Sequence, residues 1–326
     1  MPLPVLAIHG GAGTLLRSKM SPEMEQQYRA ELLSILLAGE QMLADGISAI
    51  DVVCEAVRRL EECPLFNAGK GAVYTADERH ELDASVMDGR TLAAGAVAGV
   101  SRVRNPVLAA RAVMERGEHL LFIGAAAEAY VEKLGMEMVD PGWFGTPQRL
   151  EQLRRARAET AGALLDHDGQ ASTPIMESKK FGTVGAVALD AAGHLAAATS
   201  TGGMTNKLPG RVGDSPLIGA GCYASDDSCA VSCTGTGEAF IRVAAAREVG
   251  ALMEYAGLSL DEAARRVVFE KLGRVAGQGG LIAVSKDGAV SLTFNTEGMY
   301  RGSVQQGRPP VVGIYGEAEE AANLAQ

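Results

Sequence analysis

A threonine that follows a glycine near the middle of the chain has the chemistry of a nucleophile. Thr183 begins the apolar run 183–189, and Gly182 precedes it. Threonine is β-branched and common in strands, so the residue alone indicates no more than the start of a buried strand. A glycine carbonyl before it would be open to attack, because glycine lacks a Cβ and adopts strained backbone conformations.

The segment before this pair is the least periodic stretch of the sequence. Residues 160–182 lack a regular apolar repeat, and a flexible linker that ends at Gly182 is what a self-cutting precursor needs. Cleavage between Gly182 and Thr183 would leave a free α-amine beside the threonine hydroxyl, which is a nucleophile with a built-in base. Such an amine has a pKa of about 7.7 to 8.0, so part of it is neutral near pH 7.

A glycine-rich polar loop after the next predicted strand carries a charged pair that could hold an amino acid. The loop spans residues 199–214 and places Arg211 three residues before Asp214. Arginine binds a carboxylate through two parallel hydrogen bonds, and aspartate accepts from an ammonium group. The same spacing fits a simple salt bridge within the loop, and spacing alone favours that simpler interpretation.

A second glycine-rich segment, residues 234–238, joins a predicted strand to a predicted helix. Backbone N–H groups at the start of a helix bind negative charge. Together with the Thr234 hydroxyl they could form an oxyanion hole for a tetrahedral intermediate. A tight turn with a helix cap explains the same residues equally well.

Hairpins and helix pairs dominate the predicted elements. Residues 5–9 form a short strand before the glycine turn 10–13, and residues 183–189 and 194–200 form a hairpin. Residues 22–45 and 48–60 have the apolar spacing of amphipathic helices, 147–159 read as a charged helix, and helices are also predicted over 238–255 and 260–272. This order favours helices that cover the outer faces of antiparallel sheets. We therefore predict an α+β fold with two stacked sheets between helix layers.

Composition and charge argue against several classes of protein. A chain of 326 residues can form one domain, and a net charge of −10 disfavours a nucleic-acid partner or an anionic membrane. The sequence shows no signal peptide and no membrane span, so we expect a cytoplasmic protein. The odd count of five cysteines indicates reduced thiols. The spacing of Cys222, Cys229 and Cys233 does not match paired zinc ligands.

Together these motifs resemble those of the plant-type (class 2) asparaginase and isoaspartyl peptidase family of N-terminal-nucleophile hydrolases. The matching stretches are 182–185, 201–214 and 234–237, and the similarity extends from residue 9 to residue 299. The resemblance implies a single four-layer αββα sandwich over residues 1–326. It also implies a precursor cut into an α subunit (1–182) and a β subunit (183–326), two copies of which would pair as (αβ)2.

The resemblance implies a role for each motif. Thr183 would attack the side-chain amide of L-asparagine or the isopeptide carbonyl of a β-aspartyl dipeptide, and water would then release L-aspartate from the acyl-enzyme. Thr201 would support the nucleophile, while Thr234 and Gly235 would stabilise the oxyanion. The substrate-binding residues that the resemblance implies are Asn67, Arg211, Val212, Gly213, Asp214, Thr234, Gly235, Thr236 and Gly237.

The resemblance implies no cofactor for catalysis, but it does imply a structural sodium ion. Oxygen ligands suit a hard cation. The implied ligands are the backbone carbonyls of Leu60, Glu61, Cys63, Phe66, Ala68 and Lys70.

Two alternatives stay open. The chain could be a glycosylasparaginase, although those relatives are typically exported and disulfide-bonded. It could also be a non-enzymatic α/β protein that holds an amino acid with Arg211 and Asp214, and such a protein would stay uncut.

Overall fold

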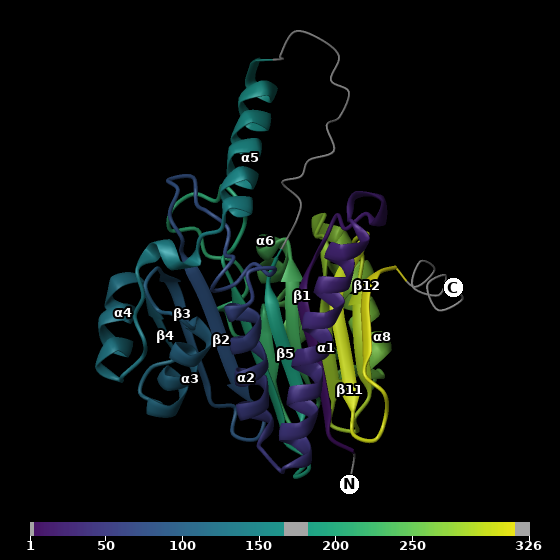
Figure 1. Cartoon of the computed structure of the whole chain (residues 1–326). Coiled ribbons are helices and arrows are strands. Elements are labelled where there is room, and N and C mark those ends of the chain that lie inside the picture. The colour runs from purple at the N-terminus through teal and green to yellow at the C-terminus, as the bar shows by residue number, and fades with distance from the viewer. Residues whose placement is uncertain (1–2, 166–181, 317–326) are drawn as a thin grey trace.

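Two stacked sheets with helices on both outer faces make up the fold (Figure 1). The computed structural model describes residues 3–165 and 182–316, and within them one sheet has eight strands and the other four. The strand orders are β12-β11-β1-β5-β6-β2-β3-β4 and β10-β9-β8-β7. The described pairings are antiparallel except for the parallel pair β3 and β4. The predicted α+β sandwich is confirmed.

The strands of the large sheet come from both halves of the chain. They are β1 (Val5–Gly13), β2 (Leu82–Asp88), β3 (Ala94–Val100), β4 (Leu121–Ile123), β5 (Val184–Leu189), β6 (Leu195–Thr201), β11 (Gly298–Gln305) and β12 (Val311–Tyr315). The strands of the small sheet are β7 (Cys222–Ala224), β8 (Cys229–Gly235), β9 (Gly279–Ser285) and β10 (Val290–Phe294).

Helices cover the two outer faces of the sandwich. On the large sheet lie α1 (Pro22–Ala44), α2 (Ala49–Glu62) and α3 (Pro106–Arg116), and on the small sheet lie α7 (Ala245–Ala256) and α8 (Leu260–Arg265) with the π-helical segment Arg266–Lys271. The other described α-helices are α4 (Gly124–Lys133), α5 (Pro147–Leu165) and α6 (Gly237–Val243). Serine residues cap the N-termini of α1, α2 and α8: the side chains of Ser21, Ser48 and Ser259 accept from backbone N–H groups of these helices.

Alternate residues of the central strands belong to two separate apolar cores. Leu6 and Ile8 of β1 pack on the side of α1 and α2, whereas Val5 and Ala7 pack on the side of the small sheet. All six residues of β5 are buried. A strand that is covered on both faces needs no polar positions, which is why residues 183–189 form an uninterrupted apolar run.

Some predicted boundaries are wrong. Residues 10–13 belong to β1 and form no turn, because the strand passes through them with a register shift between His9 and Gly11. Glycine allows this bulge, since Gly11 has a φ of +113°. The helix predicted over 238–255 is interrupted at Ala244, whose left-handed backbone separates α6 from α7.

Helix α5 extends beyond its predicted end, to Leu165. Alanine and leucine are strong helix formers, and they dominate the sequence 161–165. The first residues of the predicted linker, about 160–182, therefore belong to this helix as far as Leu165. Residues 166–181 of that linker lie outside the described residues.

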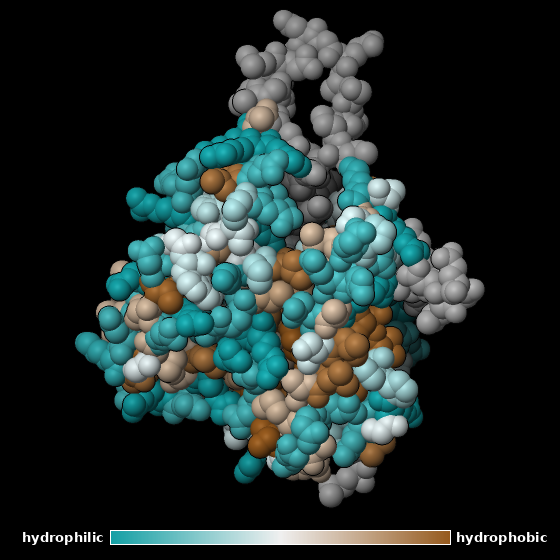
Figure 2. Space-filling model, viewed as in Figure 1, coloured by the Kyte–Doolittle hydropathy of each residue, from teal (hydrophilic) through white to brown (hydrophobic). Residues whose placement is uncertain are grey.

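Apolar side chains gather on one face of the molecule, where α1 runs beside β11 and β12 (Figure 2). Exposed Leu33 and Leu37 belong to α1, and exposed Val311 belongs to β12. Grouped apolar side chains on a surface commonly mark contacts with other proteins. Across the described residues we find no helix that combines the length and the apolar character needed to cross a membrane.

Candidate active site

The predicted catalytic and charged residues come together at one end of the sheets. Thr183 precedes β5, Thr201 ends β6, and Gly235 ends β8. Because β5 and β6 are antiparallel, with Val184 opposite Ser200, the start of one strand lies beside the end of the other. The residues that line the pocket there are Gly182, Thr183, Thr201, Gly203, Met204, Arg211, Gly213, Asp214, Ser215, Gly235 and Gly237.

Some predicted site residues are not part of this lining, and some lining residues were not predicted. Asn67, Val212, Thr234 and Thr236 are not among the described lining residues, although Asn67 contacts Gly182. Gly203, Met204 and Ser215 line the pocket without having been predicted. Gly203 and Met204 belong to the polar loop 199–214 and Ser215 follows it, so the loop as a whole was the signal.

The Thr183 hydroxyl is buried and hydrogen-bonded. Its Oγ1 donates to Thr201 Oγ1 at 3.2 Å. Thr201 Oγ1 in turn donates to the carbonyl oxygen of Gly182 at 2.9 Å and accepts from the Gly203 N–H at 2.9 Å. A chain of two hydroxyls therefore connects the predicted nucleophile with the carbonyl of the predicted cleavage site.

The Gly182 carbonyl oxygen accepts a second hydrogen bond, from Asn67 Nδ2 at 2.6 Å. Asn67 is held at both ends of its amide, because Nδ2 also donates to the Gly203 carbonyl at 2.7 Å and Oδ1 accepts from the Val73 N–H at 2.8 Å. Any side chain at position 182 would collide with it, since a Cβ there would lie 2.5 Å from Asn67 Cβ. Two donors on one carbonyl oxygen are the arrangement of an oxyanion hole.

Replacing Asn67 should slow cleavage at Gly182. We expect Asn67→Ala to cut about 10- to 100-fold more slowly, which is less than the loss usual for a lone oxyanion donor because the Thr201 hydroxyl remains. The measurement is the intact mass of freshly made precursor over time. Gln41→Ala is the matched control, because its exposed amide donates to Asp45 and not to Gly182. Equal cleavage rates for the two variants would contradict this role.

Arg211 and Asp214 both line the pocket but do not pair with each other. Arg211 Nε and Nη2 donate to the two carboxylate oxygens of Glu238, each at 2.8 Å. The simple salt bridge between Arg211 and Asp214 that spacing favoured is therefore wrong. The spacing could not reveal Glu238, which lies 27 residues from Arg211.

Asp214 is a buried carboxylate with an unused oxygen. Only 4% of the residue is exposed, and its Oδ2 accepts no hydrogen bond from the residues that the structure describes. Burial raises the pKa of this carboxyl to about 7, and the charge of Glu238 adds to the rise while Arg211 opposes it. A buried acceptor without a partner is suited to an ammonium group.

Thr234 and Gly235 lie at the end of β8, which belongs to the small sheet. Thr183, by contrast, precedes β5 of the large sheet. Thr234 Oγ1 is buried and accepts from the Ala12 N–H of β1 at 3.3 Å, so its own proton stays available for donation. Gly235 has a φ of +151°, and a Cβ on it would lie 2.3 Å from the Gln278 carbonyl oxygen. Position 235 therefore requires glycine.

A buried histidine lies near the predicted nucleophile but is a poor base. His9 pairs with Gly185 across β1 and β5, and its Nε2 is 2.9 Å from Ser232 Oγ. Complete burial lowers the pKa of the imidazole to about 3. A base with that pKa is ill matched to proton abstraction near pH 7, so an α-amine on Thr183 is the better candidate.

The loop implied to bind sodium starts at the end of α2 and carries Asn67. Gly69 and Gly71 have φ values of +49° and +97°, which lets the backbone coil tightly. A Cβ on Gly71 would lie 2.5 Å and 2.7 Å from the carbonyl oxygens of Pro64 and Phe66, so carbonyls crowd this side of the loop. The donor set is made of hard oxygens, and the residues fit a sodium ion in this respect.

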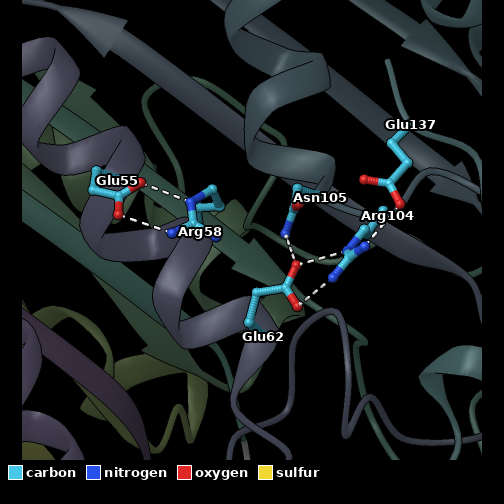
Figure 3. Close-up of polar contacts among 6 residues, drawn as sticks. All are labelled: Glu55, Arg58, Glu62, Arg104, Asn105 and Glu137. Atoms are coloured by element: carbon cyan, nitrogen blue, oxygen red, sulfur yellow. Dashed lines mark hydrogen bonds and ion pairs between the residues drawn. The ribbon is translucent and has the colours of Figure 1, made fainter.

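Side chains fix this loop against its neighbours. Figure 3 shows Glu62 facing Arg104 and Asn105: Arg104 Nε and Nη2 donate to its carboxylate at 3.0 and 3.2 Å, and Asn105 Nδ2 donates at 3.1 Å. Buried Glu61 accepts from the Val107 N–H at 2.9 Å and from Ser200 Oγ at 2.6 Å. Since Ser200 precedes Thr201, the loop is tied directly to the end of β6 that carries Thr201.

Comparison with known proteins agrees with this geometry. A model of the family described as asparaginase matches residues 2–314. The isoaspartyl peptidase of Escherichia coli K12 is 62% identical over 313 residues, 96% of each chain, and that of Salmonella typhimurium is 62% identical over 314 residues, 96% of this chain and 99% of the relative. An isoaspartyl peptidase/L-asparaginase of Xenopus laevis is 38% identical over 312 residues, 96% and 95% of the two chains. With a family match over nearly its whole length, this chain belongs to the asparaginase family of N-terminal-nucleophile hydrolases.

Proposed function

We propose that this hydrolase processes itself between Gly182 and Thr183 and then hydrolyses β-aspartyl dipeptides and L-asparagine to L-aspartate. The observation that carries the proposal is the hydrogen-bonded chain from Thr183 through Thr201 to the Gly182 carbonyl. This chain borders a pocket that also contains an arginine and an aspartate with an unused oxygen. The names of the relatives support the choice of substrates.

Self-processing uses the groups around Gly182. Thr183 Oγ1 attacks the carbonyl carbon of Gly182, the peptide C–N bond breaks, and the hydroxyl proton goes to the departing nitrogen, which becomes the α-amine of Thr183. Asn67 and Thr201 donate to the carbonyl oxygen on which negative charge develops. Water then hydrolyses the ester, which frees the Gly182 carboxylate and restores the Thr183 hydroxyl.

Turnover repeats this chemistry on the substrate. Arg211 binds the α-carboxylate and Asp214 binds the α-ammonium group, so the side-chain carbonyl of the aspartyl half faces Thr183. The neutral α-amine takes the hydroxyl proton and passes it to the leaving nitrogen, so the C–N bond breaks and ammonia or an amino acid departs. Thr234 and Gly235 stabilise the oxyanion, and water releases L-aspartate. Because asparagine and β-aspartyl dipeptides share this aspartyl half, one site serves both.

The proposal includes an (αβ)2 assembly, a structural sodium ion and a cytoplasmic location. Exposed apolar side chains of α1 and β12 support a protein contact (Figure 2). The glycine-coiled loop 60–70 supports the ion, held by backbone carbonyls with no part in the reaction. The five cysteines are buried free thiols, which supports a reducing compartment.

The test combines the intact mass of the purified protein with turnover assays. We expect two fragments that join at Gly182 and Thr183, and hydrolysis of both L-asparagine and a β-aspartyl dipeptide. A glycosylated asparagine serves as the third substrate, and a preference for it would favour the glycosylasparaginase alternative. An uncut chain that binds L-aspartate without turnover would favour the binding-protein alternative.

A further inference from the structure

The arginine of the pocket is held by a carboxylate outside the pocket. Arg211 and Glu238 form a bidentate pair, with both N–O distances at 2.8 Å. Arg211 lines the pocket, whereas Glu238 is absent from the described lining residues and its side chain is 56% exposed. Glu238 lies in the first turn of α6, directly after the glycine-rich segment 234–237.

Among the residues that the structure describes, the pair leaves part of the guanidinium without a hydrogen-bond partner. Of the five N–H donors of an arginine, Glu238 takes the one on Nε and one on Nη2. One proton of Nη1 and the second proton of Nη2 point together from the end of the side chain, and the other Nη1 proton lies on the opposite edge. The end of a guanidinium is itself a fork that matches a carboxylate.

Two glycines fix the other side of the guanidinium. A Cβ built on Gly213 would lie 3.0 Å from Arg211 Nη1, and one built on Gly237 would lie 2.9 Å from Nη2. The guanidinium therefore packs closely against Gly213 and Gly237, which have no side chains, while its remaining edge donates to Glu238. This leaves little freedom for the direction of the remaining donors.

We propose that Glu238 is a positioning residue that aims the free end of Arg211 at the α-carboxylate of the substrate and so determines the preference for substrates that carry this group. This inference rests on the function proposed above. Pre-organising a long side chain removes an ordering cost from binding. Repulsion between Glu238 and the substrate carboxylate opposes this gain. Solvent screens that repulsion, because the Glu238 side chain is 56% exposed.

Glu238→Ala and Glu238→Asp separate position from charge. Aspartate keeps the charge but is one methylene too short for the bidentate contact. We expect both variants to raise KM for L-asparagine about fivefold with kcat nearly unchanged, as expected when an interaction common to ground and transition states is lost. The matched control is Glu248→Ala, another first-turn glutamate in an ion pair, with Lys271, outside the pocket lining. An unchanged or lower KM in Glu238→Ala, or a wild-type KM in Glu238→Asp, would overturn the proposal.

Calorimetry with two ligands separates this inference from the proposed function. L-aspartate carries an α-carboxylate and an α-ammonium group, while β-alanine lacks that α-carboxylate. We expect Glu238→Ala to weaken binding of L-aspartate about fivefold and to leave binding of β-alanine unchanged, in line with the loss of one oriented ion contact. This result would stand even if the wild type showed no turnover. Equal weakening of both ligands, or no binding of L-aspartate by the wild type, would refute the role of Glu238.

Discussion

Thr183→Ala is expected to remain a single uncut chain with no measurable turnover. On the proposed mechanism the variant lacks the oxygen that would attack Gly182, and without cleavage it also lacks the free α-amine that would act as base. Loss of a catalytic nucleophile lowers turnover by about 10⁴-fold or more in hydrolases that form acyl-enzymes. Intact mass after incubation near neutral pH, followed by an asparagine assay, measures both effects in one sample.

Two further variants show whether the hydroxyl itself is responsible. Thr183→Ser keeps an oxygen in the same place and should still cut. Thr205→Ala removes a hydroxyl from the loop 201–214 at a position outside the described pocket lining, and it should cut like the wild type. Cleavage of Thr183→Ala between residues 182 and 183 would show that another residue is the nucleophile. An uncut Thr205→Ala would point to disturbance of the loop as the cause.

The sequence was most informative where one residue type is needed at a fixed place in the chain. Thr183 has to follow a glycine, because a Cβ at position 182 would collide with Asn67. The close succession of glycines and threonines at 234–237 similarly indicates a strand that ends where a helix starts. Such local requirements are visible in the order of residues, and the predictions drawn from them placed Thr183, Thr201 and Gly235 in one pocket.

Contacts between distant segments were beyond a single sequence. Asn67 and Gly182 are 115 residues apart, and nothing in the local pattern of either indicates their hydrogen bond. Glu238 has the composition of an ordinary exposed helix residue, so its pairing with Arg211 emerges only when β8 and the loop 199–214 are placed together. Strand β11 was missed for another reason, since its residues 298–305 mix glycine, arginine and glutamine with apolar residues and lack a clear alternation.

Asp214→Asn is expected to weaken substrate binding by about 10² to 10³-fold, within the range for truncating one partner of a buried charge pair. Asp214 Oδ2 has no partner among the described residues, which leaves it open to a cationic ligand. Since burial raises the pKa of the Asp214 carboxyl to about 7, the group becomes ionised only as the pH rises through that value. Binding of L-aspartate to the wild type should therefore weaken about tenfold for each pH unit below 7. In Asp214→Asn, binding should be weak at every pH, and a surviving pH dependence would assign the titration to another group.

The same substitution should make the protein more stable above neutral pH. The pKa of Asp214 is higher in the folded chain, about 7, than its ordinary value of 3.8, so the folded state holds a proton that the unfolded state releases between these values. Stability therefore falls as the pH rises from about 4 to 7, and above 7 the full penalty for the buried charge remains. Asparagine removes that penalty, and we expect a gain of about 2 to 4 kcal/mol in the free energy of unfolding at pH 8, with no gain near pH 4. Denaturant unfolding of both proteins at the two pH values measures the difference. A variant that gains nothing at pH 8 would show that the carboxylate is already stabilised in the folded chain, and its unused oxygen would then no longer mark the place of the substrate ammonium.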